Sequence, residues 1–256
     1  MPLERDVNST KVLVGVCTFN EALNIVPVIE RIRSALPDAD ILVVDDNSPD
    51  GTADAVRQQF SNLNSVQVDV RENERGLGSA ILYAVNHAID CDYDFFINLD
   101  ADLSHDPNAL PSMLGLSIAS PNVDVVIGSR YVSGGRIIGW PWQRRLMSRM
   151  VNRFATLCLR LPVSDCSGSM RCYRVTALKR IDRSRLQSEG YSLLEELLVE
   201  LHRDNAVMKE VPITFTDREE GESKLTMIEA LRSIGQMVRL SVSRRGKSQN
   251  STNPKA

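Results

Sequence analysis

Phe95-Phe96-Ile97-Asn98-Leu99-Asp100-Ala101-Asp102 is an apolar run that ends in two carboxylates. The run 95–99 predicts a buried β-strand, and the acidic residues after it predict a polar strand end. In parallel α/β sheets, ligands bind beyond the carboxyl ends of the strands. This stretch therefore predicts both the class of fold and the edge of the sheet at which a site lies.

Similar units surround this stretch. We expect further strands at 12–17, 41–44, 66–70 and 123–127, and helices at 25–36, from 52 onward and at 80–89. Strands that alternate with helices are typical of an α/β fold in which helices cover both faces of a mostly parallel sheet. In the less regular second half, segments 143–161, 191–202 and 226–242 are helix candidates, and the polar tail 244–256 is expected to be disordered.

Bulk composition excludes several classes of protein. The net charge of −3 gives no basis for nucleic-acid binding by the whole surface. The five cysteines are odd in number and form no C-x-x-C pair, which favours a reducing compartment. Residues 1–10 contain no apolar run typical of a signal peptide, and no stretch reaches the roughly 18 apolar residues of a spanning helix. We therefore expect a cytoplasmic chain that does not span a membrane.

Two other predicted strands also end in polar residues, at Thr18-Phe19-Asn20-Glu21 and at Asp45-Asp46. Asp100 and Asp102 repel each other unless a cation joins them. Mg²⁺ and Mn²⁺ prefer oxygen ligands and often keep substrate phosphates in their shell, so the pair can bridge the protein to a diphosphate. An isolated Asp-rich loop more often faces solvent or caps a helix, but three polar strand ends at one sheet edge favour a site.

Other motifs argue against alternative chemistry. Gly76-Leu77-Gly78-Ser79-Ala80-Ile81 lacks the third glycine of a dinucleotide fingerprint and follows the third strand, so it is interpreted as a tight turn into a helix. The histidines (His87, His105 and His202) are scattered, and no H-E-x-x-H is present, which disfavours zinc. Neither a P-loop nor a G-x-S-x-G motif occurs.

Positive charge is concentrated between Val125 and Ser164, where there is no acidic residue. The arginines of this segment are Arg130, Arg136, Arg144, Arg145, Arg149, Arg153 and Arg160. Interleaved apolar residues and two nearby tryptophans favour a helix lying on an anionic membrane, with a solvated basic face as an equal alternative. The polar loop 218–224 has a cation at each end and a central glycine, so it can fold over an anionic ligand.

Seven motifs occur in the order typical of one family. They are Thr18-Phe19-Asn20-Glu21, residues 43–52, Gly76-Leu77-Gly78-Ser79-Ala80, residues 100–105, Gly128-Ser129-Arg130-Tyr131, residues 167–171 and Arg218-x-x-Gly221-x-Ser223-Lys224. On these motifs, which span about residues 12–226, the chain resembles family 2 glycosyltransferases of the GT-A fold. Within that family it resembles the dolichyl-phosphate (polyprenyl-phosphate) mannosyltransferases, in a short form without transmembrane helices.

The resemblance implies roles for individual residues. Those implied to bind the nucleotide are Thr18, Phe19, Asn20, Glu21, Val44, Asp46, Asp100, Ala101 and Asp102. Those implied to hold Mg²⁺ or Mn²⁺ are Asp100, Asp102 and Ser104. Those implied to act in catalysis are Asp102, Arg130, Arg218 and Lys224, the three cations by binding donor or acceptor phosphates. The family pattern has Pro at many counterparts of Cys17, Tyr at those of Phe19, Gln at some counterparts of Ser104, and Gly-Phe or Ser-Phe at the position of Ser169-Met170.

The resemblance also implies a reaction. It is the inverting transfer of one mannose from GDP-mannose to a polyprenyl phosphate, by a protein peripheral to the cytosolic face of a membrane. The alternatives are a UDP-sugar donor (glucose or N-acetylglucosamine) and a non-catalytic nucleotide-binding subunit; the failed glycine fingerprint disfavours an NAD-dependent dehydrogenase. A membrane-anchored accessory subunit is a further partner that the resemblance allows. The absence of a Q-x-x-R-W motif favours single-sugar transfer over polymerisation.

The resemblance is to one catalytic domain. We expect it over 1–243, with a nucleotide-binding half at about 12–130 and a half that faces acceptor and membrane at about 131–243, followed by the tail 244–256.

Overall fold

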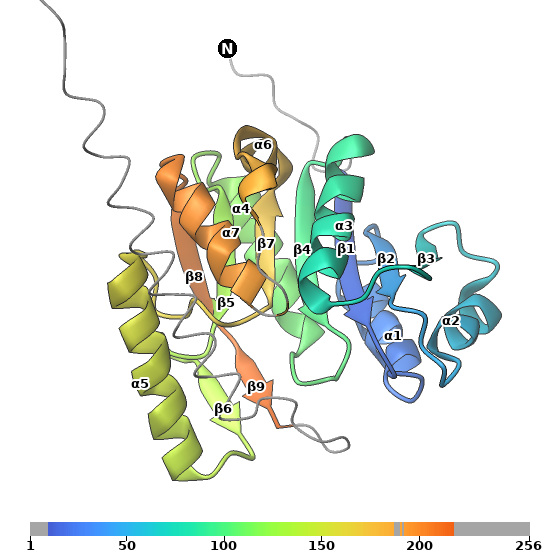
Figure 1. Cartoon of the computed structure of the whole chain (residues 1–256), viewed down its shortest axis with the longest axis horizontal. Helices are drawn as coiled ribbons and strands as arrows, with labels where there is room; N and C mark the ends of the chain where they lie inside the picture. The colour runs from blue at the N-terminus through green and yellow to red at the C-terminus, as the bar shows by residue number, and fades with distance from the viewer. Residues whose placement is uncertain (1–9, 187–189, 191, 218–256) are drawn as a thin grey trace, which may run out of the picture.

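The computed structural model describes residues 10–186, 190 and 192–217, and in this part a seven-stranded sheet is covered by helices on both faces (Figure 1). The first elements are β1 (Val12–Thr18), α1 (Ile25–Ala35), β2 (Asp40–Asp45), α2 (Thr52–Phe60), β3 (Val66–Val70), α3 (Leu77–Asp90), β4 (Phe95–Asp100), η2 (Pro107–Ala109) and α4 (Leu110–Ala119). The later elements are β5 (Val125–Ser129), β6 (Arg136–Ile138), α5 (Trp142–Leu159), β7 (Arg171–Arg174), α6 (Val175–Arg180), η3 (Arg183–Arg185), α7 (Ser192–Arg203), β8 (Met208–Pro212) and β9 (Thr214–Thr216).

The strands of the main sheet lie in the order β3-β2-β1-β4-β7-β5-β8. The first four are mutually parallel, and β8 is parallel to β5. Only β7 runs against its neighbours β4 and β5. The mostly parallel sheet predicted from the sequence is confirmed, with one antiparallel strand that was not predicted.

Alternate residues of the strands supply the two halves of the core. In β1, Leu13 packs in a cluster covered by α3, α5, α6 and α7, whereas Val14 and Val16 pack in a cluster covered by α1, α2 and α4. Gly15 lets the backbone of β1 lie close to the ring of Phe96 on β4, because a Cβ at this position would be 2.7 Å from that ring. Burial on both faces explains why these strands are almost continuously apolar.

The predicted strands and helices of the described region are present, with shifted ends. For example, β5 begins at residue 125, two residues later than predicted, and α3 begins at residue 77. The elements α4, β6, β7, α6, β8 and β9 were not predicted. The predicted helix 226–242, the loop 218–224 and the tail 244–256 lie outside the described residues.

Candidate active site

A cleft of about 330 Å³ opens at the carboxyl ends of β1, β2 and β4. Its lining residues are Cys17, Thr18, Phe19, Glu21, Asp46, Arg75, Gly76, Leu77, Ala80, Asp100, Ala101 and Asp102. The three polar strand ends therefore converge, as a parallel sheet requires. Most of the predicted nucleotide-binding residues lie on this one cleft.

Two predicted nucleotide-binding residues do not line the cleft. Asn20 is exposed, has a left-handed backbone (φ 60°) and donates its backbone N–H to Ser48 Oγ at 3.0 Å. The side chain of Val44 is fully buried in the core. The roles of these residues in nucleotide binding stay predictions.

Asp46 is held at the wall of the cleft by Arg71. The guanidinium donates from Nε to Asp46 Oδ1 at 2.7 Å and makes a second contact from Nη2, and both residues are buried. The other carboxylate oxygen, Oδ2, accepts the Gly76 N–H at 2.7 Å. Arg71 also donates to Ser79 Oγ at 2.9 Å. Asp46 thus fixes the turn before α3, with Arg75 stacked over Phe19 at 5.3 Å from its ring centroid.

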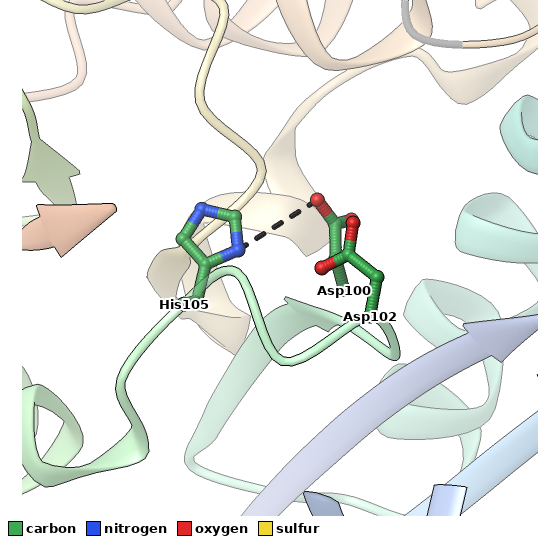
Figure 2. Close-up of side chains that lie close together, drawn as sticks. All are labelled: Asp100, Asp102 and His105. Carbon is green, nitrogen blue, oxygen red and sulfur yellow. Dashed lines mark ion pairs between the residues drawn. The ribbon is translucent and has the colours of Figure 1, made fainter. Parts of the chain in front are cut away.

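Asp100 and Asp102 face His105 across the end of β4 (Figure 2). One ligand atom from each of the three residues can be chosen so that all lie within 4.8 Å of one another. His105 Nδ1 is 3.7 Å from Asp100 Oδ2, and the backbone N–H of Ser104 donates to Asp102 Oδ1 at 3.0 Å. Burial lowers the pKa of His105 below its ordinary value, although Asp100 and Asp102 act in the opposite direction.

The residues present fit a divalent cation. Two carboxylates lie together at a cleft, and the nearby Ser104 Oγ and both ring nitrogens of His105 are buried without a hydrogen-bond partner. Buried polar atoms of native proteins are normally satisfied, so this group indicates a missing partner. Asp100 and Asp102 would hold the ion, as expected; the direct role of Ser104 stays a prediction.

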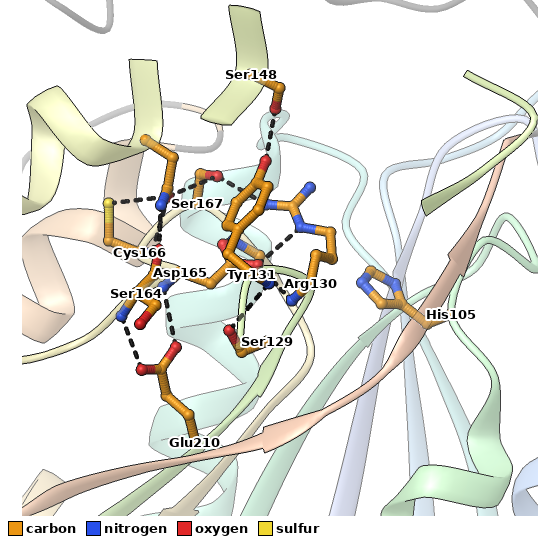
Figure 3. A network of polar contacts seen from close by, with 12 residues as sticks. His105, Ser129, Arg130, Tyr131, Ser148, Ser164, Asp165, Cys166, Ser167 and Glu210 are labelled. Atoms are coloured by element: carbon orange, nitrogen blue, oxygen red, sulfur yellow. Dashed lines mark hydrogen bonds and ion pairs between the residues drawn. The ribbon is translucent and has the colours of Figure 1, made fainter. Parts of the chain in front are cut away.

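Arg130 directly follows β5 and is paired with Asp165 (Figure 3). Its Nε and Nη2 each donate to the Asp165 carboxylate at 2.8 Å, its backbone N–H donates at 3.0 Å, and Nη2 also reaches Ser167 Oγ at 2.8 Å. Burial alone would raise the pKa of Asp165, but Arg130 holds it below its ordinary value. Nη1 of Arg130 makes no hydrogen bond with another residue of the described chain, and Arg130 is not among the residues that line the cleft, so its role in phosphate binding stays a prediction.

The loop that carries Asp165 is itself pinned. Glu210 on β8 accepts the backbone N–H groups of Ser164 at 2.7 Å and Asp165 at 3.0 Å. Figure 3 shows Arg130 between Asp165 and His105. The predicted cations Arg218 and Lys224 lie outside the described residues, so their positions relative to Arg130 stay predictions.

The predicted basic helix is α5, at one end of the molecule (Figure 1). Its apolar side chains exposed from the described part of the chain are Trp142, Leu146, Met147, Met150, Phe154 and Leu157. Arg145, Arg149 and Arg153 are exposed among them, whereas Arg144 pairs with Asp217 at 3.2 Å. No helix within the described ranges has the length and apolar composition needed to cross a bilayer.

Sequence reasoning missed His105, Asp165 and Arg71. The spacing D-x-D-x-x-H was a signal for His105, because a loop of that length can turn back on a strand end. Asp165 and Arg71 gave no local signal, since their partners lie 35 and 25 residues away.

Comparisons with known proteins identify the family of this chain. The family described as Glycosyl transferase family 2 matches residues 13–182. Undecaprenyl-phosphate mannosyltransferase of Micrococcus luteus is 37% identical over 216 residues, covering 84% of this chain and 88% of that protein. Polyprenol monophosphomannose synthase of Mycolicibacterium smegmatis is 36% identical over 217 residues, covering 84% and 81%.

Solved structures support the fold. Glucosyl-3-phosphoglycerate synthase from Mycobacterium tuberculosis, crystallised with Mn²⁺, UDP and glucosyl-3-phosphoglycerate, superposes with a TM-score of 0.67 at 16% identity, covering 93% of this chain and 81% of that one. The same protein with UDP alone gives a TM-score of 0.65. Together with the family match and the two relatives, these findings show that the chain belongs to glycosyltransferase family 2 and is a glycosyltransferase with a GT-A-like fold.

Proposed function

We propose that this chain transfers one mannose, with inversion, from GDP-mannose to a polyprenyl phosphate at a membrane surface. The observation that carries the proposal is the near full-length similarity to two proteins named for that sugar and that class of acceptor. The cleft at the ends of β1, β2 and β4 supports it, because carboxylates there suit a metal-bound nucleoside diphosphate.

The donor nucleotide would lie between the loop after β1 and the turn before α3. Phe19 and Arg75 offer a flat apolar and cationic surface to a base, and Asp46 offers carboxylate oxygens that Arg71 holds in place. Oδ1 accepts from two nitrogens of Arg71, whereas Oδ2 accepts the Gly76 N–H and has a second lone pair. Asp46 can therefore still accept from a ring N–H or a ribose hydroxyl through Oδ2.

Asp100 and Asp102 would hold Mg²⁺ or Mn²⁺, and the structural relative crystallised with Mn²⁺ and UDP supports such an ion. The bound ion would supply charge neutralisation for the departing nucleoside diphosphate. Arg130 would direct Nη1 to a phosphate, with Asp165 fixing the guanidinium. A polyprenyl phosphate is already anionic at neutral pH, so its oxygen can attack the anomeric carbon without a strong general base. Attack opposite the leaving group gives inversion.

The exposed apolar and basic face of α5 would dock on an anionic membrane. Its apolar side chains would enter the headgroup region while Arg145, Arg149 and Arg153 contact lipid phosphates. This arrangement makes the chain a peripheral protein of the cytosolic membrane face, where a lipid acceptor is available; an anchored accessory subunit could add to the attachment.

A UDP-sugar donor is the second candidate, because the structural relative was crystallised with UDP. Thermal unfolding with Mn²⁺ and GDP, UDP or NAD separates the two. A ligand at 100 times its Kd adds about 2.7 kcal/mol, which raises Tm by roughly 5–11 °C for a chain of this size. We expect that rise with GDP. A rise in Tm with UDP alone would mean that the donor is a UDP-sugar. If neither GDP nor UDP raised Tm in a metal-dependent way, the result would count against catalysis.

A further inference from the structure

We propose that His105 is the third protein ligand of the divalent cation, through Nδ1, and that this nitrogen makes the site favour Mn²⁺ over Mg²⁺. The inference rests on the proposed function in one respect, namely that Asp100 and Asp102 hold a cation. It assigns to His105 the role of third ligand that the family resemblance implies for Ser104.

The position of the ring fits direct ligation. His105 is 3% exposed, and its Nδ1 edge faces Asp100 (Figure 2). The 3.7 Å between Nδ1 and Asp100 Oδ2 is too long for a hydrogen bond. Adjacent ligands of an octahedral ion, each about 2.1 Å from it, lie about 3 Å apart. A small movement of either side chain therefore brings both atoms into one coordination shell.

The unpaired ring nitrogens of His105 point to a ligand. Both nitrogens are buried without a hydrogen-bond partner, which is unfavourable because a buried polar atom loses its bonds to water. Packing alone does not require those nitrogens, because the contact with Phe215 is an edge-to-face ring contact at 5.2 Å that a phenylalanine could also make. A buried imidazole that faces two carboxylates is explained if a metal ion lies between them.

The backbone holds His105 in this position. Leu103 has a left-handed backbone (φ 59°), which is rare for a non-glycine residue and turns the loop back toward β4. The Thr216 N–H donates to Ser104 O at 2.9 Å, and His105 bridges to Phe215 on β9. The small sheet of β6 and β9 therefore sets the ring against the acidic pair.

A nitrogen ligand has a consequence for metal choice. Mg²⁺ prefers a shell made only of oxygen, whereas first-row transition ions accept imidazole more readily. Two carboxylates alone would not distinguish Mn²⁺ from Mg²⁺ in this way. The affinity ratio of Mn²⁺ to Mg²⁺ should therefore depend on His105.

Pulsed electron paramagnetic resonance of Mn²⁺ bound to the full chain, with and without GDP, tests this directly. We expect a hyperfine coupling from one bound imidazole nitrogen, which changes isotope when the histidines are ¹⁵N-labelled. His105→Phe keeps a ring against Phe215 and should lose the coupling. Its Mn²⁺ affinity should fall on the order of tenfold or more, since even outer-shell changes cost roughly 10–100-fold. His105→Gln should lower the Mn²⁺ to Mg²⁺ affinity ratio, and His87→Gln on α3 should match wild type.

A wild-type spectrum without nitrogen coupling, a coupling that survives in His105→Phe, or no measurable Mn²⁺ binding would overturn the inference. The wild-type spectrum suffices even if His105→Phe does not fold. No sugar transfer enters the measurement. If Mn²⁺ is bound through nitrogen but the chain does not bind GDP, only the proposed function is contradicted. If the chain binds GDP specifically but the Mn²⁺ spectrum shows no nitrogen coupling, only the ligation by His105 is contradicted.

Discussion

The buried pair between Arg130 and Asp165 allows a quantitative prediction. Asp165→Asn keeps the shape of the side chain but replaces one acceptor oxygen by an amide that faces N–H donors. Asp165 is fully buried and accepts bonds from two guanidinium nitrogens and from the backbone N–H groups of Arg130 and Gly168. Removing one partner of a buried ion pair costs about 3–5 kcal/mol, because the other charge stays buried. For a chain of this size, that corresponds to a Tm lower by roughly 6–20 °C.

Urea unfolding measures this loss in the wild type, in Asp165→Asn, in Arg130→Gln and in the double variant Arg130→Gln/Asp165→Asn. The double variant removes both charges, so it should lose less stability than the sum of the singles. The folded-state pKa of Asp165 is lowered, so its contribution is present above the unfolded pKa, near pH 4, and is lost as the pH falls through the lower folded value. The difference between wild type and Asp165→Asn should therefore persist at pH 5–8 and shrink in acid.

Asp204→Asn is the matched control. It weakens a half-exposed ion pair with Arg180 (N···O 2.7 Å) and should cost less than about 1 kcal/mol. A loss below about 1 kcal/mol for Asp165→Asn, or strictly additive variants, would refute the view that Asp165 fixes Arg130.

Three further outcomes are expected. Asp102→Ala should lower the rate of sugar transfer by roughly a thousandfold or more, because several kcal/mol of transition-state stabilisation by the metal are lost. Its far-UV circular dichroism should change little, and near-normal transfer by a folded variant would contradict the metal assignment. Charge reversal at Arg145 and Arg149 should lower the affinity for anionic vesicles, measured by co-sedimentation, by about 30-fold or more, because each arginine contributes about 1 kcal/mol. Unchanged affinity would mean that the basic face of α5 contacts only solvent. Burial raises the pKa of Glu195 from 4.5 to about 8 against the opposing effect of Arg171, so wild-type stability should fall as the pH rises from about 5 to about 8, by up to roughly 5 kcal/mol. Glu195→Gln should flatten that profile in urea unfolding, and parallel profiles would contradict the shift.

The half of the sheet formed by β1 to β4 was predicted well, because β1, β2 and β4 are apolar runs with polar ends. The sequence did not predict β7, a four-residue strand that contains Arg171 and Arg174. Arg171 is fully buried and donates to the carbonyl oxygens of Gly168, Cys166 and Leu194, so tertiary contacts outweigh its polarity. No local pattern reports such contacts.

The candidate site also contains residues whose positions could be predicted from the sequence and residues whose positions could not. Asp46, Asp100 and Asp102 follow predicted strands, so their convergence could be predicted from the topology of a parallel sheet. The position of His105 depends on the backbone of Leu103 and on β9, and that of Arg130 depends on a loop after α5. Such positions follow from long-range packing and are visible only in the structure.

The most direct measurement is transfer of labelled mannose from GDP-mannose to a short polyprenyl phosphate by the purified full chain with Mn²⁺. The lipid product would be extracted, identified by mass and tested for anomeric configuration. The account predicts a mannosyl phosphopolyprenol of inverted configuration. Asp102→Ala should form it at a far lower rate, and UDP-glucose or UDP-N-acetylglucosamine should give no glycosylated lipid in its place. Transfer from a UDP-sugar but not from GDP-mannose, or a product of retained configuration, would contradict it.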